Sequence, residues 1–259
     1  MFASLLTVFI FKKMIKVIHG ECLAEMDKLI QQGIKTDIIL TDLPYNQTQN
    51  SWDVIIPLDE LWKRYLALIK DNGVVCLFGN GMFTARLMLS NPAMWKYNLI
   101  WDKKLPSGFL NANRQPLRTH EDICIFYSRQ PTYNPQKTKG LPNHGKGKPK
   151  EYANNNYGKF KFVDNKESLG DMKHPGSILR FAKPHPSKTI HPTEKPVELL
   201  KWLISTYTNE SELVLDSCCG SGSVLQAACE LNRNAIGIEI RKDYFCVSQS
   251  RIKMEPELE

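Results

Sequence analysis

The sequence lacks an apolar run long enough to cross a bilayer, which takes roughly 20 residues in a helix. The apolar run near its start, residues 2–11, is shorter than that and precedes Lys12 and Lys13. A secretory signal has the opposite order, with positive charge before the apolar segment. We therefore expect no membrane span and no secretory signal. We base no inference on residues 1–13, because Met14 opens the first clear strand.

Zinc-ligand spacing is also missing from the seven cysteines. Cys218 and Cys219 are adjacent, an arrangement that suits neither a zinc knuckle nor a disulfide framework. We expect no metal site and a reducing compartment, the cytoplasm. Apolar residues make up 42% of the chain, which is enough for a core and excludes the disordered and fibrous classes. A length of 259 residues suits one α/β domain with an insertion, or two small domains.

Positive charge is concentrated in one part of the chain. Of 34 Lys and Arg residues, 13 lie between Arg129 and Lys188, where only four of the 27 Asp and Glu residues are found. The rest of the chain is slightly acidic. Such asymmetry favours a polyanionic partner such as a nucleic acid. On charge alone, a solvated basic loop explains the pattern equally well.

Short β-rich runs recur along the chain, and several are continuously apolar, which is typical of strands covered on both faces. They are Ile15–Ile18, Asp37–Thr41, Gly73–Phe78, Asn98–Trp101, Ile123–Tyr127, Leu213–Leu215 and Ala235–Ile240. Apolar residues recur at helical spacing over residues 58–69 and 197–207, and residues 224–231 also resemble a helix. Strands that alternate with helices predict an α/β fold with a mostly parallel, doubly wound sheet.

Residues 104–190 break this alternation and are rich in Pro, Gly, Asn and Lys. We expect a strand near residues 122–128 to return to the sheet. A stretch this long inside a compact domain is usually functional or disordered. We predict that residues 14–103 and 191–259 form the two halves of one domain, with 104–190 inserted between them.

The first motif that carries chemistry, Asp42-Leu43-Pro44-Tyr45, follows an apolar strand. Ligands of α/β sheets bind outside the carboxyl ends of the strands, so Asp42 and Tyr45 would project where chemistry happens. Pro44 restricts Leu43 to an extended conformation and so fixes the direction of the Leu43 carbonyl. A carboxylate beside a carbonyl makes two acceptors for one NH₂ group, and the aromatic ring offers a face for a planar base. Taken alone, the motif is more often a simple turn.

The second motif is a strand, a Gly-rich turn and a helix. The turn reads Asp216-Ser217-Cys218-Cys219-Gly220-Ser221-Gly222-Ser223. Its glycines let the backbone approach a ligand closely, and Glu239, at the end of the next strand, can accept hydrogen bonds from ribose hydroxyls. The turn lacks the third glycine of a dinucleotide-phosphate loop, which favours a nucleoside ligand with few phosphate contacts. A purely structural turn fits this motif equally well.

The third motif, His191-Pro192-Thr193-Glu194-Lys195-Pro196, precedes a predicted helix. Its two prolines fix the entry of the chain, and Thr193 is suited to cap the helix. Lys195 would then lie near the edge of the sheet, available to a carboxylate. A plain helix cap with a solvated lysine is the alternative.

In this order, and with a basic variable segment between the first motif and the other two, the motifs resemble the β-group DNA amino-methyltransferases. The resemblance extends from about Lys16 to Ile252, and the segments Asn50–Asp53, Gly108–Ala112 and Arg118–Glu121 resemble phage- and prophage-type adenine methylases. It implies a Rossmann-like methyltransferase sheet with an inserted target-recognition region. It also implies transfer of a methyl group from S-adenosylmethionine to adenine N6 in double-stranded DNA, after the target base flips out.

The resemblance assigns roles to particular residues. Asp42 and the Leu43 carbonyl, oriented by Pro44, would accept the hydrogens of the target amino group, and Tyr45 would stack on the base. The expected cofactor-binding residues are Glu21, Cys22, Thr193, Lys195, Asp216, Cys218, Gly220, Ser221, Gly222, Ser223 and Glu239. In the inserted region, the expected readers of DNA are Asn111, Asn113, Arg114 and Arg118, with Asn154–Asn156 as further candidates. The family also implies a homodimer and a cognate restriction endonuclease as candidate partners, in a bacterial or phage-infected cell.

Three positions depart from the family pattern. Leu43 replaces a proline, Cys218 replaces a phenylalanine, and Glu21 replaces an aspartate. A backbone carbonyl is what position 43 must supply, so we expect function to survive. Asp42 favours adenine N6, because the cytosine-N4 members often have Ser there. The alternatives are a cytosine-N4 or RNA methylase, a catalytically weak DNA-binding relative, and a nicotinamide-dependent dehydrogenase, although the dehydrogenase leaves the first motif unexplained.

Overall fold

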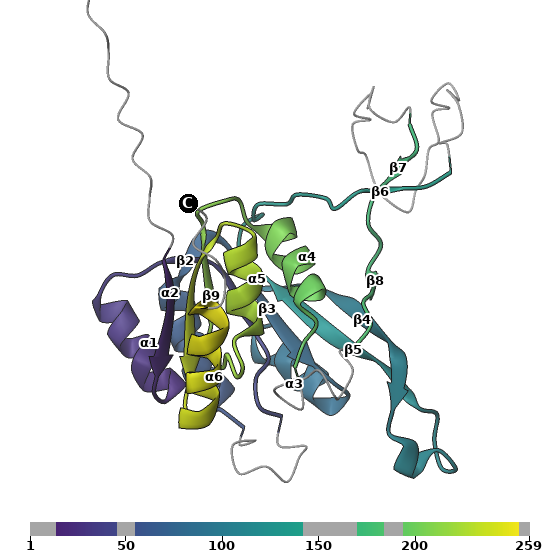
Figure 1. The fold of residues 1–259 in the computed structure, drawn as a ribbon, viewed down its shortest axis with the longest axis horizontal. Helices are drawn as coiled ribbons and strands as arrows, with labels where there is room; N and C mark the ends of the chain where they lie inside the picture. Colours follow the sequence, from purple (N-terminus) through teal and green to yellow (C-terminus); the bar gives the residue numbers. More distant parts are fainter. Residues whose placement is uncertain (1–13, 46–54, 142–169, 184–193, 254–259) are drawn as a thin grey trace, which may run out of the picture. The chain divides into compact units, whose positions relative to one another are not determined.

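A computed structural model describes residues 14–45, 55–141, 170–183 and 194–253 (Figure 1). The chain divides into two compact units, one made of Met1–Asn134 with Ser177–Glu259 and the other of Pro135–Gly176. None of the described helices combines the length and apolar character that a membrane crossing requires.

The larger unit contains an eight-stranded sheet with the order β1-β10-β9-β2-β3-β5-β4-β8. The strands are β1 (Ile15–His19), β2 (Thr36–Thr41), β3 (Ile69–Gly79), β4 (Trp95–Ser107), β5 (Arg118–Phe126), β8 (Ile178–Arg180), β9 (Leu213–Asp216) and β10 (Asn234–Glu239). In this sheet β5 alone runs antiparallel to its neighbours. Each of the seven strands predicted from the sequence overlaps one of these.

Helices cover both faces of the sheet, and alternate residues of one strand bury against different helices. The helices are α1 (Cys22–Gln31), α2 (Leu58–Leu68), α3 (Met82–Ser90), α4 (Val197–Tyr207), α5 (Ser223–Glu230) and α6 (Lys242–Lys253). Ile38 and Leu40 of β2 pack in a core with residues of α4 and α5, whereas Ile39 packs in a second core with residues of α1, α2 and α3. This two-sided burial explains the continuously apolar strands and confirms the predicted doubly wound α/β fold.

The direction of winding reverses between β9 and β2, which are neighbours in the sheet. The chain continues from β9 to β10 on one side and from β2 to β3 on the other (Figure 1). A crevice opens outside the carboxyl ends of strands at such a switch point, and ligands bind there. Asp42 directly follows β2 and Asp216 ends β9, so both lie at this edge.

Strands β4 and β5 extend into a two-stranded arm with the short helix η1 (Phe109–Asn111) at its end (Figure 1). Asp102 pairs with His120 at the base of the arm, and Ser107 pairs with Arg118. The smaller unit contains the paired strands β6 (Thr138–Lys139) and β7 (Met172–Lys173). The expected insertion, residues 104–190, therefore contributes to the arm, to the smaller unit and to β5 and β8 of the main sheet.

Candidate active site

A cavity of about 570 Å³ lies at the carboxyl ends of the central strands. Its volume is typical of ligand sites in proteins. Residues of both the Asp42 and Asp216 motifs line it, together with Glu21, Lys195 and Glu239. The sheet thus brings together side chains that lie up to 218 positions apart in the sequence.

A buried hydrogen-bond network joins the tips of β2 and β9. The Thr41 hydroxyl donates to Asp216 Oδ1 at 2.6 Å, and Ser217 Oγ lies 3.3 Å from Thr41 Oγ1. Ser217 Oγ also lies 2.7 Å from the Tyr65 hydroxyl of α2. The network fixes the two strand ends relative to each other and so sets the spacing between Asp42 and the Gly-rich turn.

The Asp42 carboxylate is held on both oxygens. The Tyr45 hydroxyl donates to Oδ1, and the Lys195 ammonium donates to Oδ2. Burial raises the pKa of Asp42, although the nearby Lys195 opposes this effect. The Leu43 side chain is buried in the core on the side of α1 and α2, and the Tyr45 ring lies 4.7 Å from the ring of Phe83.

Lys195 belongs to a group of charges that the sequence did not reveal. Its ammonium lies 3.3 Å from Glu121 Oε2, and the ammonium of Lys103 lies 3.3 Å from Glu121 Oε1. Lys195 is 8% exposed, and its ammonium lies 5.0 Å from the centre of the Phe78 ring. Burial lowers the pKa of Lys195, but the carboxylates of Asp42 and Glu121 outweigh this and raise it. The role predicted for Lys195, beside a cofactor carboxylate, stays a prediction, because here the ammonium lies on Asp42.

The carboxylate of Glu239, at the end of β10, accepts a hydrogen bond from the Gly-rich turn. The Gly220 N–H donates to Glu239 Oε2 at 2.9 Å, and the Arg241 N–H donates to Oε1 at 2.8 Å. Burial raises the pKa of Glu239, and these two N–H groups oppose that shift. Gly220 and Gly222 have φ values of 51° and 82°, in the left-handed region that glycine tolerates.

Asp216 is 3% exposed and accepts hydrogen bonds at Oδ1 from the Thr41 hydroxyl and the Cys218 N–H. Burial raises its pKa to about 7, against the effect of both donors. The pKa of the Cys218 thiol is raised well above its ordinary value. The hydrogen bond with Cys22 is the main cause, and burial is the second. The turn therefore presents a neutral thiol beside a carboxyl group that titrates near neutral pH.

We predict that Asp216 makes the protein less stable as the pH rises. The unfolded chain releases this proton near the ordinary value of 3.8, whereas the folded protein retains it up to about pH 7. The free energy of unfolding should therefore fall by up to a few kcal/mol between these pH values and level off above them. Asp216→Asn keeps the oxygen that accepts from Thr41 and should remove this part of the slope. Urea denaturation at pH 5, 6, 7 and 8 measures the free energy of unfolding of both proteins. The same dependence on pH in the wild type and in Asp216→Asn would contradict the prediction.

Glu21 and Cys22 lie at the start of α1. Glu21 caps that helix, since its Oε1 accepts from the Leu23 N–H at 3.0 Å and its Oε2 from the Ala24 N–H at 2.8 Å. Burial raises its pKa, but these two donors outweigh burial and lower it. Glu21 and Cys22 both line the cavity. The carboxylate therefore has a structural role besides the cofactor contact predicted for it.

Ser221 and Ser223 are linked to Arg251 of α6, which was not predicted as a site residue. Arg251 Nη1 donates to Ser223 Oγ at 2.8 Å and to Ser221 Oγ at 3.3 Å. Its Nη2 donates to Glu194 Oε1 at 2.7 Å. This cluster ties the Gly-rich turn to the residue that precedes Lys195. No periodic or motif signal marks Arg251, so the sequence could not have revealed it.

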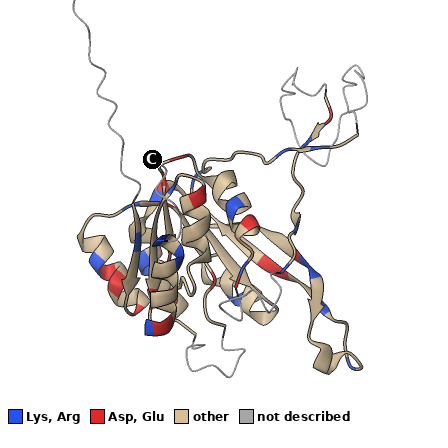
Figure 2. Cartoon of the chain, viewed as in Figure 1, with Lys and Arg blue, Asp and Glu red and all other residues tan. Residues whose placement is uncertain are grey.

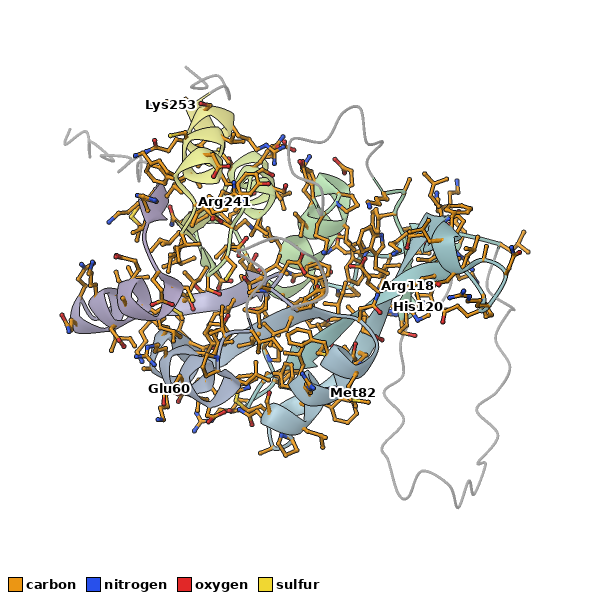
Figure 3. The ribbon with its side chains drawn as sticks, turned by 90° about the horizontal axis from the view of Figure 1, so that it is seen from below. Glu60, Met82, Arg118, His120, Arg241 and Lys253 are labelled. Carbon is orange, nitrogen blue, oxygen red and sulfur yellow. The ribbon has the colours of Figure 1, made fainter. Side chains whose placement is uncertain are left out.

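The predicted readers of DNA lie on the arm. Asn111, Asn113 and Arg114 are exposed around its end, and Arg118 begins β5 and also lines the cavity. Figure 3 shows Arg118 beside His120 on this strand. Thr193 and Asn154–Asn156 lie outside the described residues, as does the segment 50–53.

Comparison with known proteins gives consistent matches. Residues 36–250 match the sequence model of the N6/N4 methyltransferase family, which is described as DNA methylase. The chain is 29% identical to the Type II methyltransferase M.BglII of Bacillus subtilis over 168 residues, which are 61% of this chain and 42% of that protein. It is 25% identical to the Type II methyltransferase M1.MboII of Moraxella bovis over 248 residues, 88% of this chain and 93% of that one.

Solved structures show the same fold. The structure of an M1.HpyAVI–SAM complex matches with a TM-score of 0.66 and 25% identity, over 93% of this chain and all of that one. The cytosine-N4-specific PvuII DNA methyltransferase matches with a TM-score of 0.62 over 94% of this chain and 87% of that chain. At 15% identity, the second match shows the fold alone.

Proposed function

This chain belongs to the N6/N4 family of DNA methylases, and on that premise we propose that it transfers a methyl group from S-adenosylmethionine to adenine N6 in double-stranded DNA. One observation carries the proposal. The Asp42 carboxylate at the tip of β2 and the Gly-rich turn after β9 line a single cavity. An amino group held at Asp42 and a nucleoside cofactor held at the turn would therefore face each other.

The residues around the turn suit this cofactor. Glu239 presents a carboxylate for ribose hydroxyls, and the Asp216 carboxyl group, whose pKa burial raises to about 7, lines the same cavity. Bound there, S-adenosylmethionine supplies an electrophilic methyl group that needs no further activation. The remaining residues proposed to hold it are Glu21, Cys22, Thr193, Lys195, Cys218, Gly220, Ser221, Gly222 and Ser223.

The chemical task of Asp42 follows from the substrate. The exocyclic amine of adenine is a poor nucleophile, because its lone pair is delocalised into the ring. Two hydrogen-bond acceptors, the Asp42 carboxylate and the Leu43 carbonyl, favour a pyramidal nitrogen with a directed lone pair. This stabilises charge that develops in the transition state. Burial of the Leu43 side chain anchors this peptide, and we assign Tyr45 as the partner on which the flipped base stacks.

Analysis of the product tests the proposed function. Unmethylated genomic DNA is incubated with the protein and S-adenosylmethionine, digested to nucleosides and analysed by mass spectrometry. We expect N6-methyladenine. N4-methylcytosine would move the assignment to the cytosine class, and modified RNA in a parallel reaction would move it to the RNA methylases. Retained DNA binding without any product would instead identify a catalytically weak relative.

We propose that the arm contacts the DNA backbone and bases. From Lys104 to His120 it carries the exposed residues Lys104, Arg114 and Arg118 and no acidic residue. Figure 2 shows this basic character along the outer part of the arm. A surface of this kind binds phosphates and makes affinity depend on salt. Since Arg118 also lines the cavity, the arm would guide the duplex toward Asp42.

We predict that the double substitution Arg114→Ala and Arg118→Ala weakens DNA binding. If both side chains contact phosphates, the slope of log K against log salt should fall by about 2. Fluorescence anisotropy of a labelled duplex at several salt concentrations measures the slope. Arg129→Ala is the control, because Arg129 lies outside the arm and its guanidinium is 3.5 Å from Asp71. An equal effect of both changes would exclude a specific role for the arm.

We also propose that the protein forms a homodimer, that a cognate restriction endonuclease accompanies it, and that it acts in the cytoplasm, where DNA and cofactor are found. Sedimentation equilibrium of the purified protein tests for the homodimer. The endonuclease is tested by asking whether DNA methylated by this protein resists nucleases in extracts of the source cell.

A further inference from the structure

The Asp42 carboxylate, to which the proposed function assigns the target amino group, already holds an amine of the protein. The Lys195 ammonium donates to Asp42 Oδ2, and the Tyr45 hydroxyl donates to Oδ1. An incoming base therefore meets an occupied acceptor. For adenine N6 to donate to Asp42 Oδ2, Lys195 must first move away.

Lys195 cannot give up its negative partners without a large cost. Its side chain is 9% exposed, and the rings of Phe78 and Trp101 lie 5.0 and 6.0 Å from its ammonium. Removing the partner of a buried charge is strongly destabilising. Since Asp42 and Glu121 raise the pKa of Lys195 despite burial, the group remains an ammonium at neutral pH. It needs another anion wherever it moves.

Glu121 has an oxygen available for this purpose. Its Oε2 is buried and lies 3.3 Å from the Lys195 ammonium, yet makes no hydrogen bond of good geometry. Its Oε1 lies 3.3 Å from the ammonium of Lys103, which is 4% exposed and holds the carboxylate in place. Asp42, Glu121, Lys103 and Lys195 together carry two negative and two positive charges.

We propose that Glu121 is a positioning residue, which takes over the Lys195 ammonium when the target amino group reaches Asp42. The inference rests on the proposed function, because it gives Asp42 to the target base. No proton needs to move, and the net charge of the four side chains stays zero. A shift of Lys195 toward Glu121 by a fraction of its present 3.3 Å distance would complete a hydrogen bond to Oε2 and free Asp42 Oδ2.

The experiment compares Glu121→Gln with Asp122→Asn. Both remove one carboxylate from neighbouring positions of β5, but Asp122 bonds to the Thr84 hydroxyl at 2.8 Å and does not line the cavity. With Gln at position 121, Asp42 is the remaining anion beside Lys195. The ammonium should then stay on Asp42 and compete with the base. We expect kcat to fall at least about tenfold, while KM for DNA and Kd for S-adenosylmethionine change less than threefold. Asp122→Asn should leave all three within twofold.

A double-mutant cycle separates positioning from a merely structural role. In a Lys195→Met background no ammonium competes for Asp42, so Glu121→Gln should lower kcat by less than threefold. Additive losses would show that Glu121 acts independently of Lys195 and would overturn the inference. A selective loss of cofactor affinity in Glu121→Gln would overturn it too, since it would show that Glu121 acts on cofactor binding and not on the target amine.

Glu121→Asp provides a second variant at the same position. If Glu121→Gln does not fold, Glu121→Asp keeps the charge but withdraws the carboxylate, and kcat should fall between the wild-type and tenfold-reduced values. A kcat equal to that of the wild type would contradict the inference. Failure of the wild-type protein to methylate adenine would overturn the proposed function itself, whereas wild-type activity with unchanged Glu121→Gln activity would overturn the inference alone.

Discussion

Asp42→Ala should lower the rate of methyl transfer by at least about 10², because it removes an acceptor aimed at charge that develops on the target amine. Binding of S-adenosylmethionine should persist, since the Gly-rich turn and Glu239 are untouched. Initial rates with tritiated cofactor and calorimetric titration of the cofactor measure the two effects. Near-normal turnover of Asp42→Ala would refute the role assigned to this carboxylate.

Two companion variants sharpen that result. Asp42→Asn keeps an oxygen that can accept from the amine, so it should retain more activity than Asp42→Ala; equal losses would indicate that the negative charge of the carboxylate is required. Asp37→Ala, at the other end of β2, is the matched control. Asp37 Oδ1 lies 2.7 Å from the Lys70 ammonium, and Asp37 Oδ2 accepts from the Leu213 N–H. Its loss should reduce stability without changing kcat of the folded protein.

The meeting of the Asp42 and Asp216 motifs could be predicted from the sequence for a simple geometric reason. Both follow apolar strands, and the carboxyl ends of parallel strands lie at one edge of a sheet. The continuous apolar character of Ile38–Leu40 also predicted that helices would cover both faces, as the two separate cores confirm. These features depend on periodicity and strand direction, which a single sequence carries.

The partners of Lys195 could not be predicted in the same way. Glu121 lies on the antiparallel strand β5, 74 positions before Lys195. Whether Glu121 can reach Lys195 depends on the order of the strands and on the register that places Trp101 opposite Glu121. Two acidic residues, Glu121 and Asp122, precede the apolar run Ile123–Phe126, and this was the available signal. Helices α3 and α6 were also not predicted, and their apolar residues show only weak helical periodicity. Helix α1 was not predicted either, although its buried residues Cys22, Met26 and Leu29 recur at helical spacing.

Gly222→Ala should strongly destabilise the cofactor half of the protein. Gly222 has φ of 82°, and an added Cβ would lie 2.9 Å from Ser248 Cβ and 3.2 Å from Ser248 Cα. Ser248 is fully buried in α6, so the helix itself would have to move. Backbone strain and overpacking together should cost about 2–5 kcal/mol of unfolding free energy. The same movement should distort the turn and weaken cofactor binding at least about tenfold. Urea denaturation and calorimetry measure the two effects.

Gly33→Ala separates strain from crowding. Gly33 also has a positive φ, 71°, but an added Cβ would meet no atom within 4 Å. The Gly33→Ala protein should therefore lose only about 1 kcal/mol of unfolding free energy, and its affinity for the cofactor should not change. Adding Ser248→Gly to Gly222→Ala removes the nearer of the two crowding atoms and leaves the backbone of α6 in place, so it should restore part of the lost stability. Equal losses in Gly33→Ala and Gly222→Ala, without that partial rescue, would mean that the close approach of α6 to the turn does not shape the cofactor site.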